Sequence, residues 1–358
     1  MDKDVINRRV LAIRRETRRK KLGTLILTDP ANVTYATGFQ GEDSWAVIGR
    51  RKVTLLTDSR YSEQAARECP ACRIRERQGS MPQLVAAVLG KAGSTATLAV
   101  EDSISVANLK RIEKQWKRRV KSASGLVEGV RQCKEEEELL KIKRAIKIAA
   151  RALEQTLPHI KPGVREAGLA GFLDYQIRLL GASNSFATIV AFGANGSRPH
   201  HRPGNRALKS RDSLLIDFGA RYQGYCSDMT RCFFVGKPTQ LFQKAYDTVQ
   251  RAQEAALLSI AAGVRLAEVD DAARGLIQAS GMPVYGHGTG HGIGLDIHEA
   301  PFLGPDGEAT LKTHQVITIE PGIYIPGKFG IRLEEDVQVL ENGRKILTKR
   351  CAPPWRLG

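Results

Sequence analysis

The chain has 358 residues, of which 42% are hydrophobic, and a formal net charge of +17. This length exceeds what a single hydrophobic core usually serves, so two domains are expected. No apolar run is long enough for a membrane helix, and the N-terminus lacks the apolar core of a signal peptide, so we expect a cytoplasmic protein.

The positive charge is concentrated in the first third of the chain. Residues 1–132 hold 26 Lys and Arg against 14 Asp and Glu, a net +12, which leaves +5 for residues 133–358. The basic runs interleave with apolar residues and are typical of the solvated faces of amphipathic helices. Nucleic acid is therefore not expected as a partner, although a pI near 9.8 raises that question.

Short apolar runs alternate with helix-like stretches between residues 24 and 122. The runs are TLILTD, WAVIGR, KVTLLTD and ATLAVE, and the helix-like stretches are SEQAARE, MPQLVAAVLG and ISVANLKRIEKQW. This alternation predicts an α/β domain with a partly parallel sheet. We assign this N-terminal domain to residues 1–126, followed by a linker at residues 127–133.

A long helix is predicted over residues 134–157, because acidic residues crowd its first turn and apolar residues recur at helical spacing. Further helices are expected near 241–262 and 266–280, among strand-like and glycine-rich segments. The pattern predicts an α+β domain with mainly antiparallel strands over residues 134–358.

The six cysteines are scattered through the chain, which favours reduced thiols. Cys69 and Cys72 form a C-P-A-C pair, which is compatible with a redox pair or half of a zinc site. No second such pair accompanies it, so a chance spacing on a surface loop is favoured.

The first segment with chemical content is LLIDFGARYQGYCSDMTRCFFVG, residues 214–236, which is predicted to form a β-hairpin. If the turn centres on Tyr222 and Gln223, then Asp217 and Asp228 lie opposite each other across the strands, with Cβ atoms about 5 Å apart. Two facing carboxylates on an apolar hairpin require compensation, and a shared cation supplies it.

A second acidic hairpin is predicted in VITIEPGIYIPGKFGIRLEEDVQVL, residues 316–340. Glu320 and Glu334 are equidistant from Gly327 in the turn, each inside a strand-like run. The two hairpins together supply four carboxylates, and hard divalent ions prefer such oxygen ligands.

Between the hairpins lies PVYGHGTGHGIGLDIHEAP, residues 283–301, which contains His287, His291 and His298. Its glycines argue against a helix and favour a strand or loop that lets backbone approach a ligand closely. Three histidines within twelve residues, beside four carboxylates, favour a site over structural roles. His200 and His201, on a proline-flanked loop, taken alone suggest surface positions.

Four carboxylates match the charge of two divalent cations, and a histidine adds a nitrogen ligand. Such a pair, roughly 3.5 to 4 Å apart, holds a bridging water as hydroxide near neutral pH and polarises a carbonyl. This chemistry suits hydrolysis of an amide or ester, and spacing alone does not distinguish the two.

These segments resemble the metallopeptidases with the pita-bread fold, which include aminopeptidase P, prolidase and methionine aminopeptidase. IDFGA and QGYCSDMTR, HGTGHGIGLDIHEAP, TIEPGIY and GIRLEEDVQV match the family motifs in order and spacing. The resemblance implies a curved, mainly antiparallel sheet and two divalent metal ions, Mn first, with Co or Zn as alternatives. It implies that Asp228 and Glu334 bridge the ions; the full implied ligand set is Asp217, Asp228, His291, Glu320 and Glu334.

The resemblance also implies further roles. His200, His287 and His298 would line the substrate site, with His287 and His298 binding substrate and stabilising the tetrahedral intermediate. Glu320 would take the proton from the attacking water, and Arg332 would hydrogen-bond to the acidic groups. NVTYATGFQG and LLTDSRYSEQA are similar to the domain that precedes catalysis in aminopeptidase P, prolidase and creatinase. Hydrolysis of the bond before proline and a homodimer are therefore expected.

Two alternatives stay open at this point. A creatinase-like C–N hydrolase shares both domains but works without metal, and an inactive pita-bread protein would bind nucleic acid or protein. Both usually lack ligands that this chain retains. Whether a dipeptide or a longer peptide is the substrate, and which metal is native, does not follow from the sequence.

Overall fold

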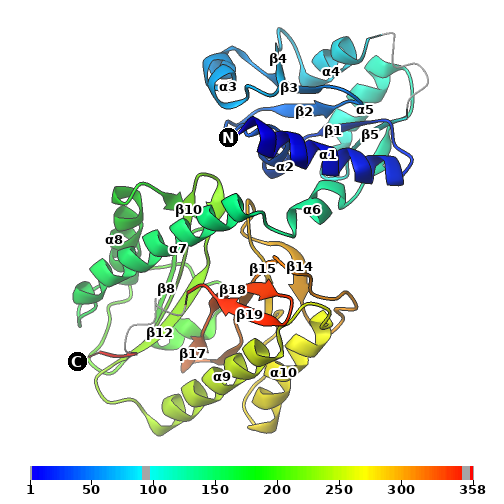
Figure 1. Ribbon diagram of the computed structural model, residues 1–358. Helices are drawn as coiled ribbons and strands as arrows, with labels where there is room; N and C mark the ends of the chain where they lie inside the picture. The colour runs from blue at the N-terminus through cyan, green and yellow to red at the C-terminus, as the bar shows by residue number, and fades with distance from the viewer. Residues whose placement is uncertain (1, 91–96, 349–354, 358) are drawn as a thin grey trace. The chain divides into compact units, whose positions relative to one another are not determined.

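The computed structural model describes residues 2–90, 97–348 and 355–357, and it divides the chain into two compact units. Unit 1 is Met1–Arg131 and unit 2 is Gln132–Gly358. Figure 1 shows both units with their helices and strands labelled. In the described part of the chain, no helix is long and apolar enough to cross a membrane.

Unit 1 is built on a mixed six-stranded sheet with the order β4-β3-β2-β1-β5-β6. Strand β2 is antiparallel to both of its neighbours, β1 and β3, whereas β3–β4, β1–β5 and β5–β6 are parallel pairs. The predicted α/β domain with a partly parallel sheet is therefore confirmed. Its strands are β1 (Thr24–Leu27), β2 (Trp45–Ile48), β3 (Val53–Thr57), β4 (Arg73–Glu76), β5 (Leu98–Glu101) and β6 (Lys121–Ala123).

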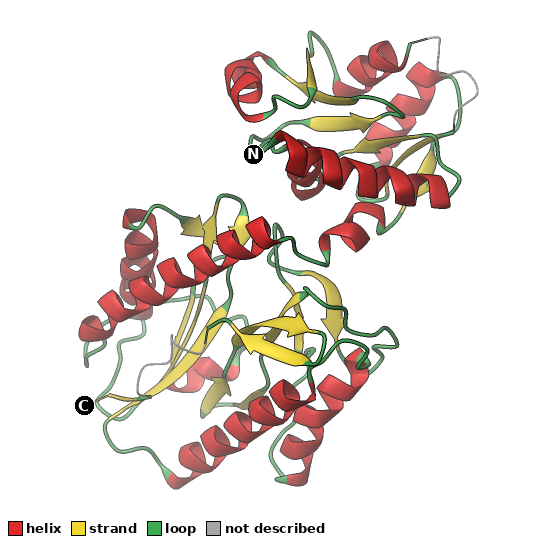
Figure 2. Ribbon diagram, viewed as in Figure 1, coloured by secondary structure: helices red, strands yellow, loops and turns green. Residues whose placement is uncertain are grey.

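Helices lie on both faces of this sheet, as Figure 2 shows by colour. Residues such as Ile26, Val47 and Val100 pack against Val85 and Ile112 of two helices, while the alternate strand residues are also buried. Burial on both faces explains why these strands are continuous apolar runs. The helices are α1 (Lys3–Arg19), α2 (Pro30–Thr37), α3 (Ser62–Glu68), α4 (Met81–Leu89), α5 (Val106–Trp116) and α6 (Leu126–Arg131).

Two details of unit 1 differ from the sequence-based interpretation. Most of the segment interpreted as a linker is helix α6, whose Leu126 and Val127 are buried. Cys69 is also buried, where it ends helix α3, so its assignment to a surface loop was wrong. Burial raises the pKa of the Cys69 thiol to about 12 and that of Cys72 to about 11, which disfavours the reactive thiolate.

Unit 2 opens with α7 (Glu136–Thr156), which has a reciprocal capping box between Glu135 and Glu138. It ends before Pro158, as predicted, because proline cannot continue the helical hydrogen bonds. The other α-helices are α8 (Glu166–Leu179), α9 (Gln240–Ser259) and α10 (Leu266–Ala279).

The largest sheets of unit 2 have the orders β20-β12-β9-β8 and β14-β13-β15-β18-β19. All pairs except β12–β20 are antiparallel, which confirms the predicted α+β class with mainly antiparallel strands. Smaller sheets are β11-β10-β7 and β16-β17. The strands are β7 (Ser183–Asn184), β8 (Ile189–Phe192), β9 (Ser213–Phe218), β10 (Ala220–Tyr222), β11 (Tyr225–Cys226), β12 (Met229–Val235), β13 (Gly290–Gly292), β14 (Glu299–Leu303), β15 (Val316–Ile319), β16 (Gly322–Ile325), β17 (Phe329–Arg332), β18 (Glu335–Leu340), β19 (Gly343–Ile346) and β20 (Arg356–Leu357).

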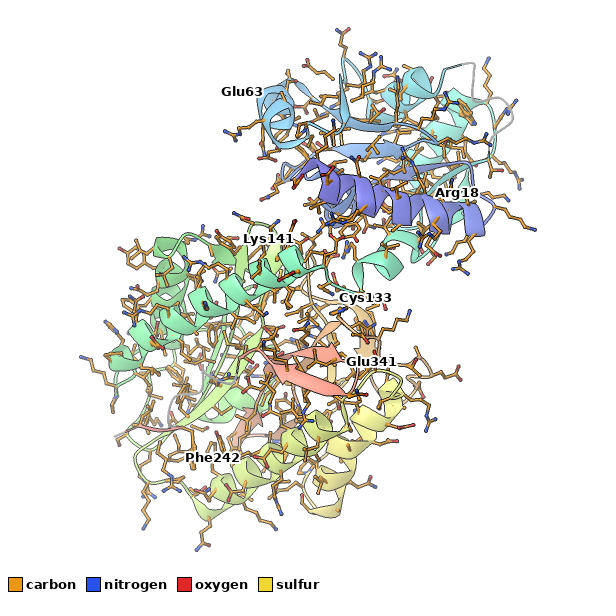
Figure 3. The ribbon with its side chains drawn as sticks, in the orientation of Figure 1. Arg18, Glu63, Cys133, Lys141, Phe242 and Glu341 are labelled. Carbon is orange, nitrogen blue, oxygen red and sulfur yellow. The ribbon has the colours of Figure 1, made fainter. Side chains whose placement is uncertain are left out.

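The sheet formed by strands β8, β9 and β12 packs against a separate hydrophobic core on each of its two faces. Leu214 and Ile216 of β9 pack with α7 and α8 residues, whereas Leu215 belongs to the core that contains α9 and α10. This alternation follows from the two-residue period of a strand. Phe242 of α9, labelled in Figure 3, anchors the second core with its ring 4.8 Å from Phe234 and 5.1 Å from Phe329.

Candidate active site

The first acidic hairpin forms as predicted, but its register differs from the prediction. Asp217 of β9 pairs with Thr230 of β12, so it does not lie opposite Asp228. The two turn residues are Gln223 and Gly224, with φ angles of 48° and 87°. Glycine adopts such positive angles without steric cost, and this moves the turn one residue beyond the predicted centre.

The second acidic hairpin has the predicted symmetry about Gly327. Strands β16 and β17 pair Gly322 with Arg332, and β15 and β18 pair Ile319 with Glu335. Glu320 and Glu334 lie between these two sets of pairs, where the chain passes from one sheet to another. They are therefore at breaks between strands and not inside continuous strands. Their side chains need not follow the alternation between the two faces of a sheet that paired strand residues obey.

The histidine-rich segment contains a short strand, β13, that carries His291 between two glycines. A Cβ atom on Gly290 would lie 1.9 Å from the carbonyl oxygen of Thr318, so only glycine permits this close approach of backbones. His287 precedes the strand in a loop. The predicted glycine-rich strand or loop is thus what the structure contains.

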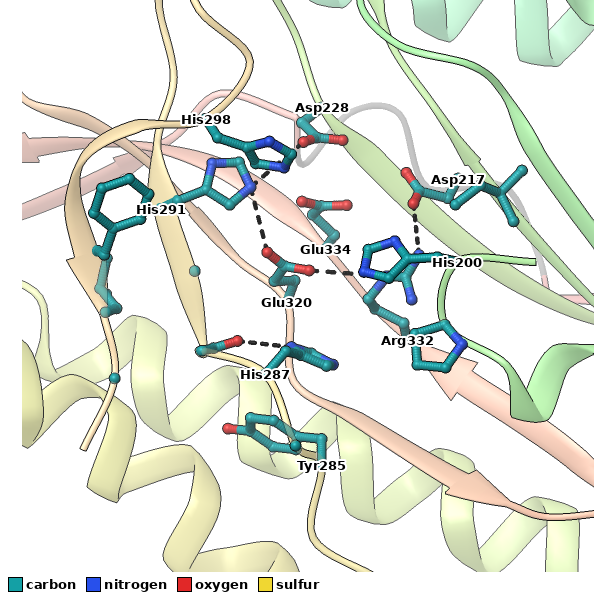
Figure 4. A pocket seen from close by; sticks show the side chains of 18 of the residues that line it. His200, Asp217, Asp228, Tyr285, His287, His291, His298, Glu320, Arg332 and Glu334 are labelled. Carbon is teal, nitrogen blue, oxygen red and sulfur yellow. Dashed lines mark hydrogen bonds and ion pairs between the residues drawn. The ribbon is translucent and has the colours of Figure 1, made fainter. Parts of the chain in front are cut away.

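These segments converge on one cavity of about 980 Å³. Figure 4 shows it from close by. Among the described residues, one cluster has metal-ligand atoms all within 4.8 Å of one another, and it consists of Asp228, His291 and Glu334. The Nε2 atom of His291 lies 3.4 Å from Glu320 Oε1 and 3.7 Å from Asp228 Oδ2. Every residue predicted for the site lines this cavity: His200, Asp217, Asp228, His287, His291, His298, Glu320, Arg332 and Glu334.

Burial and mutual repulsion disfavour the charged forms of the cavity carboxylates Asp228, Glu320 and Glu334. Burial and the neighbouring negative groups Glu334 and Asp217 raise the pKa of Asp228 well above its ordinary value. Burial and Glu320 likewise raise the pKa of Glu334, and burial raises that of Glu320 to about 7. Such an arrangement requires either protonation or a compensating cation.

The donor set fits a divalent metal ion. The Oδ1 atom of Asp217 is buried and has no hydrogen-bond partner, although buried carboxylate oxygens are normally satisfied. Burial also lowers the pKa of His291 to about 4, so its imidazole is neutral near pH 7 and its Nε2 lone pair is available. Oxygen-rich ligands with one imidazole accept several divalent ions.

Arg332 connects the acidic groups, as the sequence analysis expected. Its Nη2 donates to Asp217 Oδ2 at 2.5 Å, and its Nε donates to Thr230 Oγ1 at 3.0 Å. The Thr230 hydroxyl in turn donates to Glu334 Oε2 at 2.7 Å. Arg332 also donates through Nη1 to the hydroxyl of Tyr324 at 2.9 Å.

The remaining histidines surround the carboxylates. His287 Nδ1 lies 2.7 Å from the carbonyl oxygen of Gly288, which can only accept, so Nδ1 carries the proton. Its Nε2 then accepts from the Tyr324 hydroxyl at 3.0 Å. His298 stacks edge-to-face on His291, with ring centroids 4.5 Å apart. His200 is exposed and lines the cavity, whereas the His201 side chain is nearly buried against Glu166, so the surface prediction was right for His200 and wrong for His201.

Sequence reasoning missed several supporting residues. Thr230 and Tyr324 lie within the matched motifs, but only the three-dimensional arrangement reveals their contacts with Arg332. Asp336 accepts from the backbone amide of Asp228, and it is completely buried. The run of three consecutive acidic residues in RLEEDV was the one available signal for Asp336. The buried ion pair of Lys134 Nζ and Glu299 Oε1, 2.5 Å apart, had no sequence signal.

Comparisons with known proteins agree with this fold. Residues 140–341 match the model of metallopeptidase family M24, and residues 9–133 match the creatinase/prolidase N-terminal domain. The peptidase YqhT of Bacillus subtilis is 36% identical over 327 residues, covering 90% of this chain and 93% of that protein.

Two solved structures extend the comparison to the fold. The Xaa-Pro dipeptidase from Bacillus anthracis superposes with a TM-score of 0.94 at 33% identity, covering 98% of this chain and 100% of that chain. The X-Pro aminopeptidase from Thermotoga maritima has a TM-score of 0.86 at 34% identity, with 96% and 99% covered. The chain therefore belongs to metallopeptidase family M24, with the pita-bread fold, and it is a metal-dependent peptidase.

Proposed function

We propose that this protein hydrolyses the peptide bond that precedes proline, in a short peptide substrate, with a dinuclear centre of divalent metal ions. The observation that carries the proposal is the convergence of four carboxylates and one imidazole in a single cavity, with Asp217 Oδ1 left unpaired. The Xaa-Pro specificity of two structural neighbours supports the substrate class.

Five residues would hold the two ions: Asp217, Asp228, His291, Glu320 and Glu334. We assign the bridging positions to Asp228 and Glu334, as the resemblance to the family implies; burial and neighbouring acids raise the pKa of both carboxylates. When bound, the pair would supply a nucleophilic hydroxide near neutral pH and polarise the scissile carbonyl. Manganese is our first choice, with cobalt or zinc as alternatives, because such a site accepts all three.

The other side chains would bind substrate and move protons. Glu320, with a pKa near 7 before a cation compensates it, is suited to accept the proton of the attacking water. His287 and His298 would contact the substrate and the developing negative charge, and His200 faces the same space. Burial lowers the pKa of His287 to about 4, so it would act as a neutral imidazole. To donate to the developing negative charge from Nε2, it would have to exchange the Nδ1 proton held by Gly288 for one on Nε2 when substrate replaces the Tyr324 contact. Arg332 would hold Asp217 and Tyr324 in place.

A bond before proline is a tertiary amide without an N–H, so peptidases that depend on that donor handle it poorly. The cavity lining includes Phe186, Phe302 and Pro199, which offer apolar surface to a pyrrolidine ring. A creatinase-like hydrolase or an inactive binding protein would be expected to lack ligands, and this chain retains all five. We also propose a homodimer, which sedimentation at micromolar concentration tests.

The experiment is hydrolysis of Ala-Pro, Ala-Pro-Ala and Ala-Ala-Ala by protein reconstituted with Mn(II), with a chelated control. We expect metal-dependent cleavage of the proline peptides only. Two bound metal ions without cleavage of either proline peptide would refute the proposed substrate class.

A further inference from the structure

Two residues of the loop at residues 200–204 form hydrogen bonds to one buried carboxylate of unit 2. Glu166, at the start of α8, is completely inaccessible to solvent. Its Oε2 accepts from His201 Nε2 at 2.9 Å and from the Gly204 amide at 3.0 Å, on either side of Arg202. Its Oε1 accepts from the Phe192 amide and from Asn195 Nδ2, both at 2.8 Å.

The four hydrogen bonds that Glu166 accepts stabilise its charged, deprotonated form. Burial alone would raise its pKa, but the hydrogen bonds from Asn195, His201 and the two backbone amides lower it below the ordinary value. The carboxylate therefore stays charged near neutral pH and pins both ends of a short segment. The side chains of His200 and Arg202, which this segment carries, line the cavity from a fixed position.

Three arginines line the cavity, and two of them are already committed to protein groups. Arg274 pairs with Asp270 at 2.6 Å and donates to the carbonyl oxygens of Tyr285 and His287. Arg332 is occupied by Asp217, Thr230 and Tyr324. Within the described part of the chain, Arg202 has neither an ion pair nor a hydrogen-bond partner, and its side chain is exposed.

A dipeptide that ends in proline places its carboxylate directly beside the ring. The two proposed metal ions offset the charge of the four carboxylate ligands, but Asp306, an exposed acid that also lines the cavity, would repel the substrate carboxylate. A guanidinium can bind such a carboxylate through two parallel hydrogen bonds, which favours one orientation of the substrate. Among the arginines that line the cavity, Arg202 is thus the one available to bind the carboxylate of the substrate.

We propose that Arg202 binds the C-terminal carboxylate of an Xaa-Pro dipeptide and makes this protein prefer dipeptides to peptides extended beyond proline. The inference rests on the proposed function. It assigns specificity to a residue outside the metal ligands and the histidines, on a loop that Glu166 positions.

The test compares Ala-Pro with its C-terminal amide, which lacks the negative charge but keeps the scissile bond. Both are assayed with the Mn(II)-reconstituted protein and with Arg202→Gln, Arg202→Lys and Arg198→Gln. Arg198 is the matched control, because it removes the same charge from an exposed arginine that donates to Asn195 and does not line the cavity.

We expect the wild-type protein to favour the acid over the amide in kcat/KM by about 10- to 100-fold, the range of one charged hydrogen-bonded pair. Arg202→Gln should abolish this preference by raising KM for the acid to the value for the amide. Arg202→Lys should retain part of the preference, and Arg198→Gln should behave as wild type.

Equal rates on acid and amide in the wild-type protein would overturn the inference even if a variant failed to fold. A full acid preference in Arg202→Gln would overturn it as well. Failure of the wild-type protein to cleave Ala-Pro, its amide and Ala-Pro-Ala is a different result, because it refutes the proposed function itself.

Discussion

Arg332 and Asp217 form a buried ion pair, with Nη2 and Oδ2 2.5 Å apart, in the middle of four clustered carboxylates. This pair ties the proposed metal ligands to Thr230 and Tyr324, which the same guanidinium contacts. A planar group with several donors is needed to reach all three partners together.

Replacing Arg332 with lysine should therefore weaken the site although the charge is kept. A lysine ammonium can hold Asp217, but it cannot also contact Thr230 and Tyr324 in the same geometry. We expect kcat/KM to fall about 10- to 100-fold, as for the loss of one or two charged hydrogen bonds. Arg198→Lys is the control. Wild-type kinetics in Arg332→Lys would contradict the positioning role.

Asp228→Asn should abolish turnover and leave the fold intact. The substitution removes a buried negative charge whose pKa is raised by burial and by Glu334, so the metal-free protein should be as stable as wild type or more stable. Metal ions should no longer raise its melting temperature, because ligand-linked stabilisation requires binding to the folded state. Calorimetry with and without Mn(II) measures both effects, and normal activity would remove the two-metal claim.

His287→Ala should lower turnover far more than metal content. The imidazole lies in the cavity, yet its two nitrogens contact Gly288 and Tyr324 and no carboxylate. We expect kcat to fall at least about 100-fold if the group stabilises the transition state. Metal content by emission spectrometry should stay near the wild-type stoichiometry. Equal losses of activity and metal would make His287 a ligand.

Gly290→Ala should destabilise unit 2 strongly. The added methyl group would meet the Thr318 carbonyl oxygen at 1.9 Å, which cannot move without disturbing the β13–β15 pairing. We expect a loss of about 3 kcal/mol or more, at the upper end of overpacking effects. Gly286→Ala is the matched control, since its methyl group would meet nothing within 4 Å. Equal denaturation midpoints for the two variants would contradict the packing argument.

Glu101 in unit 1 should make stability depend on pH. Burial raises its pKa from 4.5 to about 7, although Asp29 and Thr28 donate their amides to it. Between these values the folded state binds more protons than the unfolded chain, so the free energy of unfolding falls as pH rises. The contribution is no more than about 3 kcal/mol.

Denaturant titrations of the wild-type protein and Glu101→Gln between about pH 4.5 and about pH 8.5 isolate this effect. Trp355 belongs to unit 2, so both proteins carry Trp355→Phe, and tryptophan fluorescence then reports on unit 1 through Trp45 and Trp116. The stability difference between the two proteins should change across the window and level off only about one pH unit above the folded pKa of Glu101. A difference that is independent of pH would show that Glu101 does not titrate as stated.

The sequence was most informative where local patterns determine structure. Continuous apolar runs indicated the strands of unit 1, and the spacing of Leu139 and Ile142 indicated helix α7, because both signals depend on burial within one element. The second hairpin was predictable, since the symmetry of Glu320 and Glu334 about Gly327 survives the strand breaks.

Pairing between distant segments was less accessible. The first hairpin was placed one residue too early, because the sequence does not say that Gln223 shares the left-handed conformation with Gly224. The role of Glu166 depends on His201 and Gly204, which lie 35 and 38 residues away in the chain. Such partners are fixed by how helices pack on sheets, and no local periodicity records them.

The position of Glu320 and Glu334 at the strand breaks has a consequence for mutational studies. Both carboxylates reach the cavity only while the β16–β17 hairpin keeps its pairing of Gly322 with Arg332. Shortening the turn at Gly327 by one residue would force a slip that points one of the two carboxylates elsewhere, while most of the apolar core could still assemble. A loss of metal affinity would then indicate that the two strands are out of register. Circular dichroism would not detect this change, because the secondary-structure content would stay nearly the same.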